Sequence, residues 1–313
     1  MTIKLGVVMD PISTLHYKKD STLALLWEAG DRGFEIHYFE QKDLFIHRGK
    51  AFGQSRLLKV SRDPASWFEL SESSLIELSS LDIILMRKDP PFDIEYIYTT
   101  CILELAEMLG VRIINKPQSL RDFNEKLFTT WFPDISPPTL VTRDSQLLKD
   151  FFHEQKDIVC KPLEGMGGLS VFHLIEGDEN FSVVWEILSN QGTRYIMAQQ
   201  YIPDIVDGDK RILLINGEPI PYALARVPSP GEFRGNLARG AKGVAKPLSQ
   251  RDREICDRVG PLFREKGLFF VGIDVIGDYL TEINITSPTC IRELDEQCHL
   301  NIAKTFWDAI PCV

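Results

Sequence analysis

The chain has 313 residues, of which 44% are hydrophobic and 26% charged, and its formal net charge is −10. This composition is typical of a folded globular protein large enough for two or more domains, and it excludes collagen-like and disordered chains. The negative charge disfavours nucleic acid and anionic membranes as partners, so small anionic substrates would have to bind at local clusters of lysine and arginine.

The N-terminal segment lacks the basic start, the long apolar core and the small-residue cleavage site of a signal peptide. All apolar runs are of strand length, so we expect a cytoplasmic protein without membrane association. The cysteines show no C-x-x-C spacing and the histidines no metal-binding spacing. A disulfide framework and a zinc site are therefore not expected.

Apolar strands alternate with helices in the first third of the chain. A repeated strand–helix pattern is typical of a parallel sheet covered by helices, in which ligands bind beyond the carboxyl ends of the strands. The expected strands are residues 3–9, 34–39, 81–86 and 111–115, the expected helices are residues 21–29 (with Asp20 as N-cap) and 96–109, and a hairpin insertion is expected through residues 52–60.

Two loops fall at the edge where ligands are expected. Asp10 and Pro11 follow the first strand, and RKDPPFD at residues 87–93 follows the third. No G-x-G-x-x-G motif follows the first strand, which disfavours a dinucleotide site. The proline-rich loop is equally consistent with a ligand site and with a rigid connection.

A domain boundary is expected between residues 118 and 123, and a helix at residues 120–131 would carry Lys126. Lys161 ends a later strand, directly before the glycine-rich loop LEGMGG. Glycines allow backbone N–H groups to approach phosphate oxygens closely. The loop is not a Walker motif, and a plain hairpin turn would explain it equally well. The neighbouring elements expected are strands 139–142, 157–162 and 169–174 and helix 145–155.

A strand at residues 195–201 and an acidic turn precede a hairpin whose turn is Asn216-Gly217. Its two strands carry Arg211 and Arg226. The next segment, PSPGEFRGNLARGAKG at residues 228–243, contains four glycines and the cations Arg234, Arg239 and Lys242. Such a segment cannot bury a core, which favours either a lid that closes over anions or an ordinary surface loop.

A second hairpin is expected at residues 271–285, between a helix at 248–266 and a closing helix at 291–310. If its loop is residues 277–279, Asp274 lies opposite Glu282, and Asn284 shares the face of Glu282. Two carboxylates and an amide suit a hard cation such as Mg²⁺. A solvated edge hairpin with ordinary surface charges is the alternative.

The order of these features resembles the ATP-grasp superfamily. More closely, the segments MDP, RKDPPFD, NKPQSLRDFNEKLF, CKPLEGMGG, DGDKR, RGNLARG and LTEINITSPTCIRE are similar to those of bacterial glutathione synthetases and cover nearly the whole chain. The resemblance implies an α/β fold, with an N-terminal parallel-sheet domain and a two-part α+β ATP-grasp fold. The implied divisions are residues 1–122, 123–194 (with the glycine loop) and 195–313 (with the metal site and lid).

The resemblance implies an ATP-dependent ligase that joins γ-glutamylcysteine to glycine through an acyl phosphate, with Mg²⁺ or Mn²⁺ as the metal, in a homotetramer. The implied nucleotide-binding residues are Lys126, Lys161, Gly165, Gly167, Gly168, Gln199, Gln200, Tyr201, Ile202 and Asp209. The implied metal ligands are Asp274, Glu282 and Asn284, the implied catalytic arginines are Arg211, Arg226 and Arg234, and the implied peptide-binding residues are Ser287, Pro288, Thr289 and Arg292.

Two alternatives accompany this interpretation. The first is another ATP-grasp ligase, such as a D-alanine or glutamate ligase, which an acceptor screen would distinguish. The second is a nucleotide-binding regulatory module without catalysis. Such a module would be expected to lack a metal ligand or an arginine, whereas this chain retains all of them.

Overall fold

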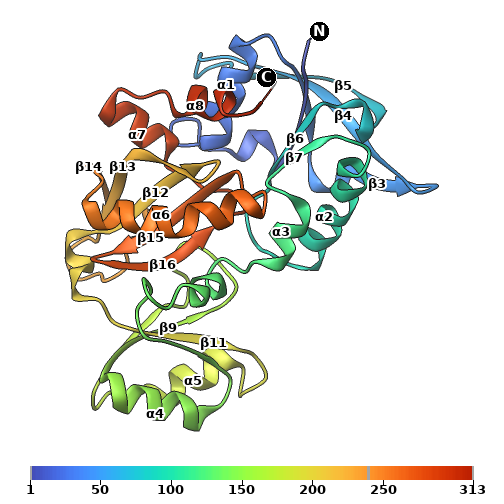
Figure 1. Ribbon diagram of the computed structural model, residues 1–313. Coiled ribbons are helices and arrows are strands. Elements are labelled where there is room, and N and C mark those ends of the chain that lie inside the picture. Colours follow the sequence, from blue (N-terminus) through green and yellow to red (C-terminus); the bar gives the residue numbers. More distant parts are fainter. Residues whose placement is uncertain (1, 238–239, 312–313) are drawn as a thin grey trace.

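The computed structural model describes residues 2–237 and 240–311, so the predicted lid residue Arg239 lies outside the described residues. Three sheets follow one another along the molecule, with the N-terminal sheet at the top of Figure 1, the C-terminal sheet in the middle and the central sheet at the bottom. None of the described helices is long and apolar enough to cross a membrane.

The N-terminal sheet confirms the predicted parallel sheet and hairpin insertion. Its parallel strands are β1 (Lys4–Met9), β2 (Glu35–Phe39), β6 (Ile83–Arg87) and β7 (Arg112–Ile114). An antiparallel extension is formed by β3 (Leu44–His47), β4 (Lys50–Val60) and β5 (Phe68–Glu77). The helices of this part are α1 (Ser21–Asp31) and α2 (Ile94–Glu107). Asp20 caps α1 by accepting from Leu23 N. Met9 pairs with Arg87, so both predicted ligand loops begin side by side, and Lys88 Nζ lies 2.9 Å from Asp10 Oδ1.

The predicted helix at residues 120–131 is wrong. The chain instead forms α3 (Pro117–Asp122) and a 3₁₀ segment (Leu127–Trp131). Between them Asn124 Oδ1 accepts from Lys126 N at 3.1 Å and from Leu127 N at 2.9 Å. An asparagine side chain that bonds to nearby backbone N–H groups competes with helix formation, which explains the break. Lys126 therefore begins the second segment instead of lying inside a helix.

The central sheet is antiparallel, in the order β10-β9-β11-β8. It consists of β8 (Thr139–Thr142), β9 (Asp157–Pro162), β10 (Phe172–Ile175) and β11 (Ile196–Gln200), and it packs with α4 (Ser145–Gln155) and α5 (Phe181–Ser189). The glycine loop joins β9 to its antiparallel neighbour β10, so it is also the hairpin connection that the sequence allowed. The sheet includes β11, which the predicted division at residue 195 places in the C-terminal part.

The C-terminal sheet contains one strand that the sequence analysis missed. Its strands are β12 (Asp209–Ile215), β13 (Glu218–Val227), β14 (Lys242–Pro247), β15 (Phe270–Ile276) and β16 (Tyr279–Asn284), and α6 (Gln250–Glu265) packs beside them. β14 places Lys242 in a strand instead of in the predicted lid. β14 lies at an edge of the sheet beside β13, a position that tolerates Gly243 and Pro247 within the strand.

The predicted closing helix at residues 291–310 is two helices, α7 (Ile291–Cys298) and α8 (Ile302–Asp308). His299 adopts a left-handed conformation with φ of 54°, which ends the first helix. Asn301 starts the second, because its side chain accepts from Lys304 N at 2.9 Å. The chain thereby reverses and packs α8 against α1, with Trp307 Nε1 donating to Leu25 O.

The distribution of buried residues determines where the site lies. Apolar residues of the N-terminal and C-terminal sheets share continuous cores, which join Val8 to Ile273 and Ile36 to Phe270. The central sheet has a core of its own, built around Ile158 and Leu188. The junction between the central and C-terminal sheets is therefore not filled by a common core, and the main cavity opens there.

Candidate active site

A solvent-open cavity with an empty volume of about 900 Å³ lies between the central and C-terminal sheets. Every residue predicted to bind the nucleotide contributes to its wall, together with one predicted catalytic arginine and two predicted metal ligands. These residues are Lys126, Lys161, Gly165, Gly167, Gly168, Gln199, Gln200, Tyr201, Ile202, Asp209, Arg234, Asp274 and Glu282. The fold thus brings residues of both sheets and of the lid into one site.

Other predicted residues lie beside this cavity or away from it. Arg211, Arg226 and Asn284 contact Asp274 without lining the cavity. Among the peptide-binding candidates, Pro288 O accepts from Arg87 Nη2 at 3.0 Å, which joins that segment to the end of β6. Ser287 contacts the same strand through Arg87 O at 3.4 Å, and Thr289 lies between Pro288 and the start of α7.

Arg292 is not part of the nucleotide cavity. Its guanidinium group stacks over the Trp27 ring, 4.5 Å from the centroid, and donates to Tyr17 O at 3.2 Å. It lines a separate cavity between α1, α7 and α8. The structure therefore brings Arg292 against the N-terminal domain and outside the nucleotide cavity.

The second hairpin has the predicted pairing but a different turn. Asp274 pairs with Glu282, and Gly272 pairs with Asn284, as the predicted register requires. Ile276 pairs with Tyr279, so the loop has two residues instead of three, and a bulge after Asp274 supplies the extra residue. The bulge keeps the two carboxylates on neighbouring strands at the same level of the sheet.

Asp274 is held by two buried guanidinium groups. Arg211 contacts it through two bonds, of 2.5 Å and 3.0 Å, and Arg226 Nη2 lies 2.9 Å from Asp274 Oδ2. Arg226 also bonds to the Asp209 carboxylate. Burial alone would raise the pKa of Asp274, but the two arginines hold it below its ordinary value. Asp274 is therefore ionised at neutral pH.

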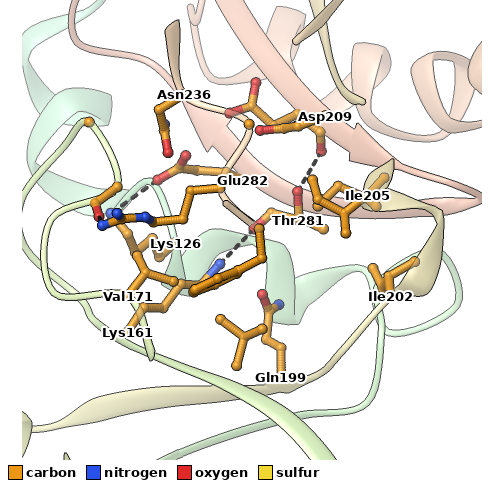
Figure 2. A pocket seen from close by; sticks show the side chains of 18 of the residues that line it. Lys126, Lys161, Val171, Gln199, Ile202, Ile205, Asp209, Asn236, Thr281 and Glu282 are labelled. Atoms are coloured by element: carbon orange, nitrogen blue, oxygen red, sulfur yellow. Dashed lines mark hydrogen bonds and ion pairs between the residues drawn. The ribbon is translucent and has the colours of Figure 1, made fainter. Parts of the chain in front are cut away.

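Two lysines approach the cavity from the central side. Lys126 Nζ lies 3.0 Å from Glu282 Oε1 and donates to Gly165 O at 2.9 Å, while Lys161 Nζ donates to Thr281 O at 3.3 Å. Figure 2 shows Lys126 and Glu282 directed toward each other, with Lys161 beside them. Burial lowers the pKa of Lys126, but the Glu282 carboxylate more than offsets this and raises it overall. This part of the cavity can therefore neutralise phosphate charge.

Burial lowers the pKa of Lys161 to about 8, although Glu282, Asp209 and Asp274 act in the opposite direction and Lys126 adds to the decrease. Bound phosphates favour the ammonium form, so we expect ADP affinity to fall as the pH rises above about 8, by up to about tenfold per pH unit. Isothermal titration of ADP from pH 7 to 9.5 measures the slope of the logarithm of ADP affinity against pH. The Lys161→Met variant should bind ADP weakly and without the slope, and a slope of equal size in that variant would contradict the prediction.

The lid and the glycine loop contact each other. Arg234 Nη1 donates to Gly168 O at 3.0 Å, and Arg234 is itself fixed by two bonds to Glu232. Gly168 has φ of +71°, and a Cβ built there would lie 2.3 Å from Asn236 Oδ1. This left-handed backbone conformation favours glycine, and a larger residue would also have to displace the Asn236 side chain. The described residues of the predicted lid therefore contact the glycine loop in the cavity wall.

The opposite end of the cavity is aromatic and apolar. Tyr201 stacks on His173 with ring centroids 4.0 Å apart, and the lid residue Phe233 approaches His173 at 5.6 Å. Ile202 and Ile205 complete this wall. An apolar wall with an aromatic ring suits a planar base.

The residues present fit a nucleotide. Asp209 Oδ1 is buried and has no hydrogen-bond partner among the described residues, although Asp209 lines the cavity. A ligand hydroxyl would supply the missing donor, as a ribose does. Burial raises the pKa of Asp209 to about 6 against the effect of Arg226. A carboxylate left with an open acceptor in the cavity wall is therefore consistent with the predicted ribose contact.

The donor set also fits a divalent cation that is shared with phosphates. Asp274 and Glu282 line the cavity, and Asn284 Nδ2 lies 3.3 Å from Asp274 Oδ2. Within residues 2–237 and 240–311, no group of three or more His, Cys, Asp and Glu side chains is arranged to hold a metal by itself. Mg²⁺ at nucleotide sites usually takes one or two carboxylates and completes its coordination with phosphates and water. Two carboxylates with one amide match that requirement.

Three of the residues that the sequence analysis missed lie beside predicted site residues. Asn236 and Phe233 lie in the wall beside Arg234, within the segment of which the sequence analysis considered only the glycines and cations. Glu125, directly before Lys126, bonds to the chain after β16. Its proximity to that strand could not be read from local sequence, because the two segments are about 160 residues apart.

Two family models match the chain. "Prokaryotic glutathione synthetase, N-terminal domain" matches residues 3–121, and "Prokaryotic glutathione synthetase, ATP-grasp domain" matches residues 125–299. The glutathione synthetase of Pseudomonas syringae pv. tomato is 57% identical over 310 residues, which are 99% of this chain and 97% of that protein. The glutathione synthetase of Vibrio parahaemolyticus is 56% identical, over 98% of both chains.

A solved structure supports the fold. The ATP-grasp ligase PsnB, complexed with a phosphomimetic variant of minimal precursor, Mg and ADP, matches 99% of this chain and 98% of that chain with a TM-score of 0.62. Its sequence identity is 16%, so the likeness concerns the fold alone. The family models and the relatives cover nearly the whole chain, and the cavity has the groups that a nucleotide requires. The chain therefore belongs to the prokaryotic glutathione synthetase family and is an ATP-dependent ligase with an ATP-grasp fold.

Proposed function

We propose that the chain joins γ-glutamylcysteine to glycine with ATP, forming glutathione, ADP and phosphate, and that the residues of the main cavity have the roles assigned below. Membership of the family supports the reaction. The observation that carries the site assignment is the convergence of Lys126, Lys161, Asp274 and Glu282 on one cavity beside the glycine loop.

The reaction requires activation of a carboxylate, because a carboxylate does not react with an amine at neutral pH. Transfer of the terminal phosphoryl group of ATP to the cysteinyl carboxylate gives an acyl phosphate and ADP, and attack by the glycine amine then releases phosphate. The chemistry demands positioned cations more than a side-chain nucleophile. Lys126 and Lys161 bind the phosphates in this proposal, and Asp209 binds the ribose.

Asp274, Glu282 and Asn284 are the proposed ligands of Mg²⁺, and Mn²⁺ would suit the same oxygen donors. The cation would neutralise phosphate charge during transfer. Arg211 contacts Asp274 and also lies close to the peptide segment, since a Cβ built at Gly272 would meet both Arg211 and Pro288 within 3.0 Å. This placement supports a role for Arg211, with Arg226 behind Asp274, in stabilising negative charge at the reacting carbonyl.

The peptide would enter from the N-terminal side. Ser287, Pro288 and Thr289 are proposed to bind it, because Pro288 and Ser287 contact the end of β6 where the Asp10 loop and the 87–93 loop meet. The position of Arg292 against Trp27 supports an indirect role for it, in holding α7 to α1. We also propose the division into residues 1–122, 123–194 and 195–313 and the homotetramer that the resemblance implies. The cytoplasmic location expected from the N-terminal sequence and the short apolar runs is likewise a proposal.

The lid is proposed to keep water from the acyl phosphate, and Arg234 links it to the glycine loop. Arg234→Ala should therefore hydrolyse ATP without matching glutathione formation, with the ratio of ADP to glutathione rising from one to about two or more. Parallel assays of ADP and glutathione measure the ratio. Arg258→Ala, which removes an exposed ion pair with Asp134, serves as the control and should stay fully coupled. Full coupling in Arg234→Ala would count against the lid assignment.

Oxygen-isotope transfer tests the acyl phosphate. γ-Glutamylcysteine labelled with ¹⁸O in the cysteinyl carboxylate should pass one ¹⁸O to the released phosphate, because that oxygen bridges carbon and phosphorus in the intermediate. Mass spectrometry of the phosphate measures the transfer. Unlabelled phosphate accompanied by normal glutathione formation would exclude this route.

A further inference from the structure

β16 lies at the edge of the C-terminal sheet, so its outward backbone N–H groups need partners from another segment. Glu125 supplies two of these partners. Its backbone carbonyl accepts from Ile283 N at 2.9 Å, and its carboxylate oxygen Oε1 accepts from Ile285 N at 2.8 Å. Residues two apart in a strand point their N–H groups to the same side, so one residue outside the sheet occupies the place of a neighbouring strand.

The same carboxylate oxygen also fixes the turn that follows β16. Glu125 Oε1 accepts from Thr286 N at 3.0 Å and from Thr286 Oγ1 at 2.9 Å. One oxygen therefore gathers three donors where the chain passes from Asn284, a proposed metal ligand, to Ser287, a proposed peptide contact. The direction of the chain between these two functional residues depends on this oxygen.

The neighbours of Glu125 attach the same short segment to the central sheet. Asn124 Nδ2 donates to Leu163 O at 3.2 Å, and Lys126 contacts both Gly165 O and Glu282. Residues 124–126 thus join the glycine-loop side of the cavity to the edge of β16. A shift of this segment along the edge would separate Lys126 from Glu282.

We propose that Glu125 is a positioning residue: it fixes residues 124–126 against the edge of β16, and so holds Lys126 opposite Glu282 and orients the chain that carries Asn284. The inference rests on the proposed function, since it takes Lys126 and Glu282 to meet the nucleotide and its metal. Glu125 touches neither substrate nor metal in this account. It acts through the backbone that it holds.

The role depends on the position of an acceptor oxygen and not on charge. Burial, and then the nearby Glu282 carboxylate, raise the pKa of Glu125, while its three donors lower it. Protonation would leave Oε1 available as an acceptor. Glutamine keeps an oxygen at the same reach without the charge, whereas aspartate keeps the charge but is one methylene shorter. These two substitutions separate geometry from electrostatics.

The test measures the affinity of the variants for unmodified ADP with Mg²⁺ by isothermal titration, together with their melting temperatures. Glu125→Ala should weaken binding by about 10–100-fold, the usual effect of removing a group that orients metal ligands. Glu125→Gln should stay within about threefold of the unmodified chain, and Glu125→Asp should resemble Glu125→Ala. Thr286→Val removes one of the three donors and should cause a smaller loss than Glu125→Ala.

Ser249→Ala is the matched control for stability. Ser249 caps α6 through Asp252 N and does not line the cavity, so its loss should lower the melting temperature without changing ADP affinity. The proposal is overturned if Glu125→Ala binds the nucleotide as tightly as Ser249→Ala, or if Glu125→Gln is impaired while Glu125→Asp is not. Should Glu125→Ala fail to fold, the Gln and Asp variants decide the same question. Nucleotide binding is measured without an acceptor, so a wrong assignment of the peptide substrate would leave this result intact.

Discussion

Glu282→Gln is expected to abolish turnover, with a fall of at least about a thousandfold in kcat, equivalent to about 4 kcal/mol of activation free energy. Glu282, a proposed metal ligand, also pairs with a lysine that is proposed to bind phosphate, through the contact of 3.0 Å with Lys126. The amide has the same size but supplies no charge to a cation or to Lys126. Asn284→Ala should act in the same direction, because it removes the neighbouring oxygen donor.

Steady-state assays at several Mg²⁺ concentrations measure the effect of Glu282→Gln. Glu254→Gln, which changes an exposed glutamate on α6, is the control and should retain full activity. Melting curves should show that both variants fold. Normal turnover in folded Glu282→Gln, or a loss of equal size in the control, would contradict the metal assignment.

Asp274→Ala is expected to lower the free energy of unfolding by about 3–5 kcal/mol, because it leaves two buried guanidinium groups without the carboxylate between them. Arg211 and Arg226 are 6% and 4% exposed, so water cannot replace the lost partner. Removing one of the charges as well should reduce the damage. The double variant Asp274→Ala, Arg211→Met should therefore be more stable than Asp274→Ala alone.

Urea unfolding at several pH values measures this prediction. The pKa of Asp274 is lower in the folded chain than its ordinary value of 3.8, so its contribution is complete above pH 3.8 and is lost as the pH falls through the folded value. As the pH falls below the folded pKa of Asp274, the difference in free energy of unfolding between Asp274→Ala and the unmodified chain should become smaller. A loss under about 1 kcal/mol at pH 7 would show that the arginines find other partners.

Predictions from the sequence were most accurate for features whose residues all lie in one short segment. The pairing of Asp274 with Glu282 follows from strand alternation and a nearby turn, and the pair formed although the turn was shorter than expected. The bulge compensated for the missing loop residue. A bulge depends on the neighbouring strand, so local pattern could not reveal it.

The errors arose where a side chain or a distant strand outweighed local helical or loop preference. Asn124 interrupts the apolar pattern around Lys126 by bonding to the backbone, and His299 ends a pattern that continues into α8. β14 depends on its pairing with β13, and its own composition of glycine, lysine and proline gives no strand signal. A side-chain bond to the nearby backbone and a left-handed residue decide the first two features, and the pairing with a distant strand decides the third.

The same distinction applies to the site. Lysines and glycines that bind phosphate occur in recognisable local patterns, so the predicted nucleotide residues all reached one cavity. Arg292 lies in a segment that also resembles the family pattern, but the turn into α7 directs its side chain to Trp27. No local sequence pattern identifies Glu125 as part of the site, because its partners at residues 283–286 become its neighbours only after folding.

The most direct test of the account is ADP release by the purified chain with MgATP, γ-glutamylcysteine and glycine, repeated with each component left out and with glutathione measured in parallel. The account predicts that ADP is released only when every component is present, with one glutathione formed for each ADP. Release that is indifferent to γ-glutamylcysteine, or glutathione that fails to accumulate in the complete mixture, would contradict it.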